Sequence, residues 1–192
     1  MQTQIKKTSY TPEEYLALEK DAEIKHEYRD GEIVPMTGGT TNHNKITGNF
    51  FFQLKLALSG ENYDIYMGDV RLWIPEYRQY TYPDIMVIPG EPIYEGKGRT
   101  TVTNPCLIAE VLSNSTKTRD RGDKFQYYRS IPQLQEYILI DQYSYYIEQF
   151  AKKSQREWIF KEYQGENAIL TLETMAIQIT FKDIYAKVEF ES

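Results

Sequence analysis

Two carboxylates stand inside strand-like apolar runs of this 192-residue chain: Asp84 in YPDIMVI and Glu110 in CLIAEVL. A buried carboxylate without a partner loses much of its hydration energy, so such an acid usually has a cation, a metal ion or a shifted pKa. Pro83 can begin a strand because its missing N–H is tolerated there, which puts Asp84 at the mouth of its strand. If the two runs are neighbouring strands, the acids lie close together and repel each other unless a cation lies between them. Hard divalent ions fit, and Mg²⁺ takes one or two carboxylates together with water and substrate phosphate.

Side chains alternate along a strand, so Glu110 and Leu112 share one face while Val111 points to the other. A zinc site is disfavoured, because the chain has only two histidines, His26 and His43, and one cysteine, Cys106. The cysteine lies in an apolar run and is expected to be a buried thiol rather than a nucleophile. A disulfide framework is excluded, which fits a reducing cytoplasm.

The net charge of −6 opposes a broad electrostatic hold on nucleic acid, because neutralising phosphates requires lysine and arginine. A local basic patch remains possible in the stretch 117–129. Its charged residues are Lys117, Arg119, Arg121, Lys124 and Arg129, against Asp120 and Asp123.

The elements that must position these residues begin after a loose tail at 1–9. In 10–36 we expect a helix, with Thr11 as cap, Pro12 at its first position and Glu14 completing a capping box, and then a hairpin turning at Asp30-Gly31. A longer helix is expected over 41–60. Its apolar residues recur at i+4 steps, which indicates one buried face: Ile46, Phe50, Leu54 and Leu58.

Strands are expected at 69–74, 82–88 and 106–112, followed by a helix over 115–131 and a strand at 135–141. The core, 40–141, would therefore read helix, three strands, helix, strand. Strands on either side of a helix should be parallel through a right-handed crossover. The prediction is a single α/β domain, 1–192, with a mixed sheet and helices on both faces.

Short strands with turns indicate an antiparallel extension over 142–192, with a short helix around 181–185. The tyrosine-rich segment 143–150 carries aromatic rings on both faces. We expect it at a sheet edge or an interface away from the active site, and a homodimer would be its simplest cover. Because no run approaches the length of a membrane span and no secretory signal is visible, we expect a cytoplasmic protein.

The order of these features resembles the PD-(D/E)XK nuclease superfamily, in which Pro-Asp on one strand is followed on the next by an acid, any residue and a lysine. Within it, the chain is similar to the Uma-two family of restriction-endonuclease-like proteins. The stretches that carry this likeness are YTPEEYLALE, HEYRDGEIVPM, YTYPDIMV and AEVLSNSTKTRDRGDKFQYYRSIPQLQEYILID. The resemblance implies a restriction-endonuclease-like core and hydrolysis of DNA with Mg²⁺ or Mn²⁺.

The chain departs from the motif at its lysine, because Leu112 occupies that position. The resemblance implies a migrated lysine from the following helix, and Lys124 matches. Asp84, Glu110 and Lys124 are then the catalytic candidates. The implied metal ligands are Asp84, Glu110, the Val111 carbonyl and the upstream acid Glu32, with Asp69 as a further candidate.

Ordinary structural roles compete with each of these assignments. Asp84 could cap a turn, Glu110 could pair with Lys124 or an arginine, and Lys124 could be a solvated helix residue. Glu32 could be an exposed hairpin residue, and Asp69 could cap a strand. His43 could be an ordinary residue of a helix N-terminal turn. We expect Tyr127 and Tyr128 in core and rim positions rather than as base-stacking platforms. At the level of function, the alternative to a nuclease is a non-catalytic module that keeps the fold for protein or nucleic-acid binding.

Overall fold

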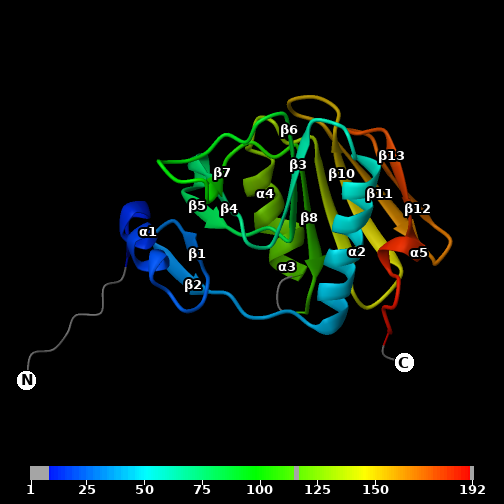
Figure 1. Cartoon of the computed structure of the whole chain (residues 1–192), viewed down its shortest axis with the longest axis horizontal. Coiled ribbons are helices and arrows are strands. Elements are labelled where there is room, and N and C mark those ends of the chain that lie inside the picture. Colours follow the sequence, from blue (N-terminus) through cyan, green and yellow to red (C-terminus); the bar gives the residue numbers. More distant parts are fainter. Residues whose placement is uncertain (1–8, 115–116, 191–192) are drawn as a thin grey trace, which may run out of the picture.

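The structure is a computed structural model that describes residues 9–114 and 117–190. The chain begins with a helix and a hairpin, α1 (Pro12–Lys20), β1 (His26–Arg29) and β2 (Glu32–Pro35), on the left in Figure 1. Thr11 caps α1 in the capping box expected from the sequence. Asp30 and Gly31 join the strands with φ values of 42° and 106°, and positive φ at both positions is typical of a tight hairpin turn.

This hairpin belongs to a five-stranded sheet with the order β2-β1-β5-β4-β7. The other strands are β4 (Arg71–Ile74), β5 (Gln79–Thr81) and β7 (Thr101–Val102), with a short 3₁₀ turn, η1 (Pro75–Tyr77), between β4 and β5. Three buried tyrosines, Tyr15, Tyr28 and Tyr80, pack α1 against this sheet. The first sheet therefore has a small aromatic core of its own.

A second sheet of six strands has the order β11-β10-β9-β8-β6-β3. Its members are β3 (Tyr63–Met67), β6 (Ile85–Pro89), β8 (Leu107–Leu112), β9 (Glu136–Asp141), β10 (Tyr146–Lys152) and β11 (Trp158–Gln164). Strands β8 and β9 pair in parallel, as the crossover rule predicts, and the other neighbours pair antiparallel. The mixed α/β fold class is confirmed.

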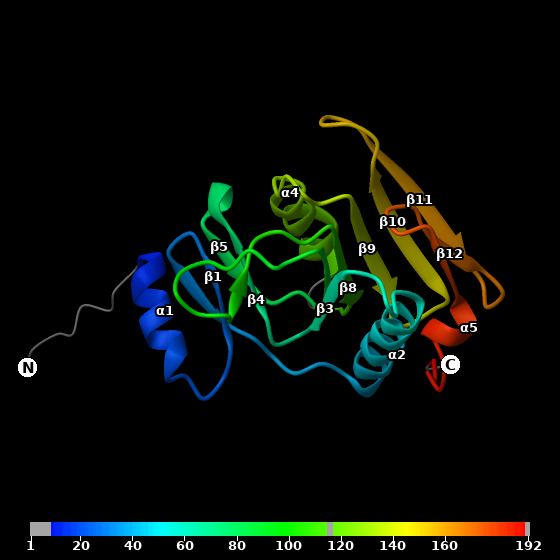
Figure 2. The ribbon, with the colours of Figure 1, turned by 45° about the horizontal axis from the view of Figure 1, so that its top comes forward.

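Helices cover both faces of the six-stranded sheet, as Figure 2 shows. One face packs against α2 (Thr41–Ala57), α5 (Phe181–Ile184) and the small sheet of β12 (Ile169–Leu172) and β13 (Ile177–Thr180). The i+4 face predicted for the long helix is buried there: Ile46, Phe50, Leu54 and Leu58. The other face packs against β4, β7 and the helical segment after β8. Side chains of that segment contact Glu110 on β8.

The helical segment after β8 has three parts: α3 (Lys117–Arg119), a π-helical turn η2 (Asp120–Lys124) and α4 (Phe125–Tyr128). A π turn widens the helix by one residue and is common at functional sites. Residues 115 and 116, where the sequence places the start of this helix, lie outside the described residues.

Two expectations about the strands were wrong. The run 69–74 forms β4 of the other sheet, and the third strand before the helix is β3, which shows only one buried residue, Ile65, and so gave no apolar run to recognise. The segment 143–150 is not an edge either. Its strand, β10, is paired on both sides by β9 and β11, and the edge strands of the sheet are β11 and β3.

The remaining expectations about burial hold. Cys106 is buried, and burial raises the pKa of its thiol to about 12. Tyr128 is buried in the core and Tyr127 is half-buried, with its ring centroid 4.7 Å from that of Tyr77. Over the part of the chain that the structure describes, none of the helices combines the length and apolar character needed to traverse a bilayer.

Candidate active site

The two acids singled out by the sequence stand opposite each other at the end of the six-stranded sheet. Ile85 of β6 pairs with Ala109 of β8, so the next step of the antiparallel register sets Asp84 beside Glu110. The Asp84 backbone N–H donates to Glu110 Oε2 over a long 3.5 Å, and the Val111 N–H donates to Asp84 Oδ2 at 2.7 Å. Val111 thus orients Asp84 through its N–H.

Lys124 reaches into this pair from the π turn. Its Nζ lies 2.9 Å from Glu110 Oε1, and the Tyr128 hydroxyl donates to the same oxygen at 2.6 Å. Nζ also lies 3.1 Å from Oδ1 of Asp120, a distance that makes an ion pair without hydrogen-bond geometry. The Lys124 side chain is 9% exposed, so it is not a solvated helix residue.

Acidic groups outnumber basic ones around Lys124, and this determines the electrostatics of the site. Burial raises the pKa of Glu110 to about 7, because the charge of Lys124 does not offset desolvation and the nearby charges of Asp84 and Asp120. Burial would lower the pKa of Lys124, yet Glu110, Asp120 and Glu27 raise it well above its ordinary value. Both shifts are upward, so the ammonium stays protonated, whereas Glu110 takes up a proton near neutral pH unless a further cation offsets the acidic charges around it.

His43 contacts one of the acids of the cleft, Asp84. It lies in the first turn of α2, and its Nε2 is 2.9 Å from Asp84 Oδ1. Gly39 packs against the imidazole so closely that a Cβ there would lie 3.1 Å from the ring. Burial lowers the pKa of His43, but the Asp84 hydrogen bond and charge outweigh it and leave the pKa raised. His43 is therefore both a helix-turn residue and a neighbour of Asp84.

The upstream acid of the cleft is Glu27 on β1, not Glu32. The Glu27 carboxylate is buried, accepts hydrogen bonds from Thr81, Arg29 and Arg119, and lines the same cavity as Asp84. Burial would raise the pKa of Glu27, but the charges of Lys124 and Arg119 and the bonds from Thr81 and Arg29 lower it to about 2.

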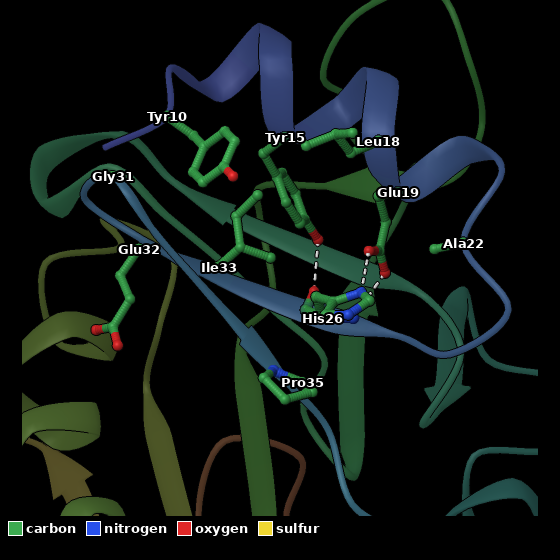
Figure 3. Close-up of a pocket in the computed structure, with 10 residues that line it drawn as sticks. All are labelled: Tyr10, Tyr15, Leu18, Glu19, Ala22, His26, Gly31, Glu32, Ile33 and Pro35. Carbon is green, nitrogen blue, oxygen red and sulfur yellow. Dashed lines mark hydrogen bonds and ion pairs between the residues drawn. The ribbon is translucent and has the colours of Figure 1, made fainter. Parts of the chain in front are cut away.

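Glu32 and Asp69 are not brought to the site. Glu32 lies on β2 directly after the turn, where it is exposed and lines a separate pocket beside α1; in Figure 3 its carboxylate points away from His26 and Glu19. Asp69 is exposed at 85% of its side chain and pairs with Lys25. Neither residue lines the cavity that holds Asp84 and Glu110, so neither is placed to share an ion with them.

The site is a cavity of about 400 Å³ between the two sheets. Its charged residues are Glu27, Asp84, Glu110 and Asp120 against Arg29, Arg119 and Lys124, with His43 beside them. Tyr143 and the loop of Gly38 and Gly39 also line it. The Asn114 N–H donates to the Tyr143 hydroxyl at 3.4 Å, so the tyrosine-rich segment touches the site instead of standing apart from it.

Sequence reasoning missed Glu27, Asp120 and the two arginines as site residues. Asp120 and Arg119 lay in the recognised basic stretch, and the i, i+4 spacing of Asp120 and Lys124 was a readable signal for a shared helix face. The stretch HEYRDGE gave little sign of Glu27, because no local pattern there shows which side of the strand faces the cleft. These residues meet through contacts between the two sheets, which local patterns do not encode.

The donor set suits a hard dication. Among the described residues, Glu110 Oε2 accepts only the long bond from Asp84, and facing carboxylates on neighbouring strands are the oxygen ligands such ions prefer. Among the residues that the structure describes, no three His, Cys, Asp or Glu side chains are arranged to hold a metal ion together. Two carboxylates with water and phosphate oxygens are nevertheless a usual set for Mg²⁺.

Comparisons with known proteins identify the family of the chain. The family model "Uma2: Putative restriction endonuclease" matches residues 12–182. "Uncharacterized protein sll1609" of Synechocystis sp. (strain ATCC 27184 / PCC 6803 / Kazusa) is 46% identical over 167 residues, covering 87% of this chain and 94% of that protein. "Uncharacterized protein slr1290" of the same organism is 34% identical over 180 residues, covering 94% and 93%.

A solved structure shares the fold. The crystal structure of "a putative nuclease belonging to DUF820" from Anabaena variabilis ATCC 29413 superposes with a TM-score of 0.70. The match covers 92% of this chain and 98% of that chain at 16% identity, so the likeness concerns the fold.

Proposed function

Since the chain belongs to the Uma2 family and has a nuclease-like fold, we propose that it is a metal-dependent endonuclease that hydrolyses phosphodiester bonds in DNA. The observation that carries this proposal is the constellation of Asp84, Glu110 and Lys124 in one cavity between the sheets. We propose Asp84 and Glu110 as the ligands of Mg²⁺ or Mn²⁺. Such an ion, when bound, would polarise the scissile phosphate and lower the pKa of a bound water.

The chain's own residues have separable roles in this proposal. Lys124 is a protonated donor, suited to stabilising charge that develops on a phosphate oxygen or to orienting water, and not to acting as a base. Tyr128 fixes Glu110 through its 2.6 Å hydrogen bond, and the Val111 N–H fixes Asp84. His43 holds the second oxygen of Asp84. The carboxylates are therefore oriented before any ligand arrives.

The test combines manganese binding by calorimetry with cleavage of a supercoiled plasmid. Asp84→Asn and Glu110→Gln should each abolish both activities, because each removes one of two proposed anionic ligands. Asp69→Asn and Glu32→Gln make the same chemical changes at exposed positions outside the cavity and should behave like the wild type. Unchanged manganese affinity in both cleft variants would refute the proposed ion site.

The second candidate is a non-catalytic nuclease-fold module, and one observation favours it. Leu112 occupies the position of the motif lysine and is buried in the core at 2% exposure. A module of this kind needs neither manganese binding nor cleavage. A wild-type protein that binds DNA yet neither binds manganese nor cuts would establish this second function.

A further inference from the structure

One carboxylate holds two guanidinium groups at the wall of the cleft. Glu27 Oε2 accepts from Arg119 Nη1 at 2.5 Å and from Arg29 Nη2 at 2.7 Å, while Glu27 Oε1 accepts from the Thr81 hydroxyl. The Glu27 side chain is 7% exposed, whereas those of Arg29 and Arg119 are 30% and 22% exposed. The acid thus lies within the protein, while both arginine side chains are partly exposed and line the cavity.

These guanidinium groups keep donors for a ligand. A guanidinium has five N–H donors in a planar fork. Among the described residues, Arg119 makes one hydrogen bond to Glu27, and Arg29 makes two, through Nη2 at 2.7 Å and Nε at 3.2 Å. Two positive charges share one negative charge, so this wall of the cavity carries an excess positive charge. Elsewhere in the same cavity, the three acids around Lys124 outnumber it: Asp84, Glu110 and Asp120.

The charges of the whole cavity indicate which ligands it fits. Its four carboxylates and three basic side chains leave one excess negative charge when all are ionised and His43 is neutral. One dication reverses that balance to one excess positive charge. One phosphodiester, with a single negative charge, then makes the cavity neutral. Buried or half-buried charge is stable only when it is compensated in this way.

We propose that Arg29 and Arg119 form a clamp that binds a phosphodiester group of a nucleic-acid strand, with Glu27 as the positioning residue that holds the two guanidinium groups side by side. This proposal rests on the proposed nuclease function and assigns it a substrate-binding subsite. Arginine suits the role because its planar fork matches two phosphate oxygens at once. Without Glu27 the two like charges would repel each other and separate.

The clamp also gives the contact between the two sheets a role. Arg29 comes from β1 of the five-stranded sheet, and Arg119 comes from the helical segment over the six-stranded sheet. Glu27, also on β1, bonds to Arg119, which lies 92 positions later in the sequence. A phosphodiester held by both arginines would therefore be held between both halves of the molecule, facing Lys124 and the acids.

The experiment measures binding of a fluorescently labelled hexathymidylate by anisotropy, with calcium in place of magnesium, for the full chain. Arg119→Gln and Arg29→Gln should each weaken binding about ten- to hundredfold, as for the loss of one hydrogen bond to a charged group. Arg156→Gln removes the same charge from an exposed position outside the cleft and should change affinity less than about twofold. Glu27→Gln and Arg119→Lys should bind weakly as well, because the first releases both arginines and the second keeps the charge but loses the fork.

The outcomes separate this proposal from the proposed function. If the wild type binds and the clamp variants bind equally well, the clamp is wrong while the nuclease can stand. If the wild type does not bind the oligonucleotide, the clamp is overturned, and cleavage of the same oligonucleotide with manganese decides whether the nuclease falls with it. A Glu27→Gln protein that loses folding leaves the decision to Arg29→Gln and Arg119→Lys, whose circular dichroism must match that of the wild type.

Discussion

Lys124 shows how far reasoning on single residues reaches. The sequence predicted its place in the Asp84–Glu110 cleft, because the motif position held Leu112 and the following helix offered a replacement. It did not predict Asp120, whose carboxylate shares the ammonium, because an acid in a mixed-charge helix looks like an ordinary solvated residue. The missing information was the burial of that helix face, which depends on how the segment packs over Glu110.

Replacing Lys124 with alanine should reduce cleavage about 10²–10³-fold, as for the loss of one donor to a transition-state oxygen. It should also lower the free energy of unfolding by about 3 kcal/mol, because Glu110 and Asp120 would face each other in the interior without a shared cation. Plasmid cleavage and urea unfolding provide the measurements, with the exposed Lys117→Ala as control. Normal cutting by Lys124→Ala would remove the lysine from the proposed mechanism.

Glu27 makes stability depend on pH at the acid end. Its pKa is about 2 in the folded protein, below the ordinary value of 4.5, so the folded state binds this proton less readily than the unfolded state. Its stabilisation is therefore complete above about pH 4.5 and is lost as the pH falls toward 2, a change of about 3 kcal/mol. Urea unfolding of the wild type and Glu27→Gln at pH 6, 4 and 3 should show curves that converge on acidification. Curves that remain parallel over this range would contradict the assignment.

At the scale of elements, long and regular patterns were readable and short ones were not. The i+4 face of α2, the capping box of α1 and the parallel β8–β9 crossover follow from local spacing and chain order. Strand β3 was missed because it buries only Ile65, and β4 was placed in the wrong sheet because an apolar run does not say which sheet it joins. Partner choice among strands is a matter of long-range contacts.

The hairpin turn provides a test at this scale, because it positions the strand that carries Glu27 and Arg29. Gly31 has φ of +106°, and a Cβ there would overlap the Ser9 side chain. Gly165 has φ of +96° with open space around it. Gly31→Ala should lower the free energy of unfolding by about 2 kcal/mol, and Gly165→Ala by about 1 kcal/mol. Both variants have a strained backbone at positive φ, and only the first also has the steric overlap. Equal losses in thermal unfolding experiments would mean that Ser9 moves aside without cost.

At the scale of the whole molecule, the cleft exists because two sheets meet. Neither sheet alone contains the site. Strand β1 contributes Glu27 and Arg29, Asp84 directly precedes β6, and β8 carries Glu110. The net charge of −6 gives no broad electrostatic hold on nucleic acid, so the proposed binding would depend on the two arginines that line the cavity, Arg29 and Arg119. Composition reports the total charge, whereas binding depends on its distribution.

The homodimer expected from the sequence remains a proposal, and the structure indicates a different strand, β11, for its interface. One edge of the six-stranded sheet is β11, where Ile159 is 40% and Phe160 is 49% exposed. Exposed apolar edges favour pairing with another chain. We expect sedimentation to show a dimer at micromolar concentration, and Phe160→Lys to shift it to monomer while Phe52→Lys on the exposed face of α2 does not. A wild type that sediments as a monomer throughout would contradict this.

The π-helical turn at Asp120–Lys124 has a consequence for how such proteins are recognised. Because the ammonium approaches Glu110 from 14 positions downstream, the string that would identify the motif in the sequence is absent, although the arrangement of functional groups is present. A pattern written with fixed gaps would pass over this chain and accept others whose residues never meet. A search based on interatomic distances among a carboxylate pair, an ammonium and two guanidinium groups would find the same arrangement even where an insertion has changed the spacing of these residues in the sequence.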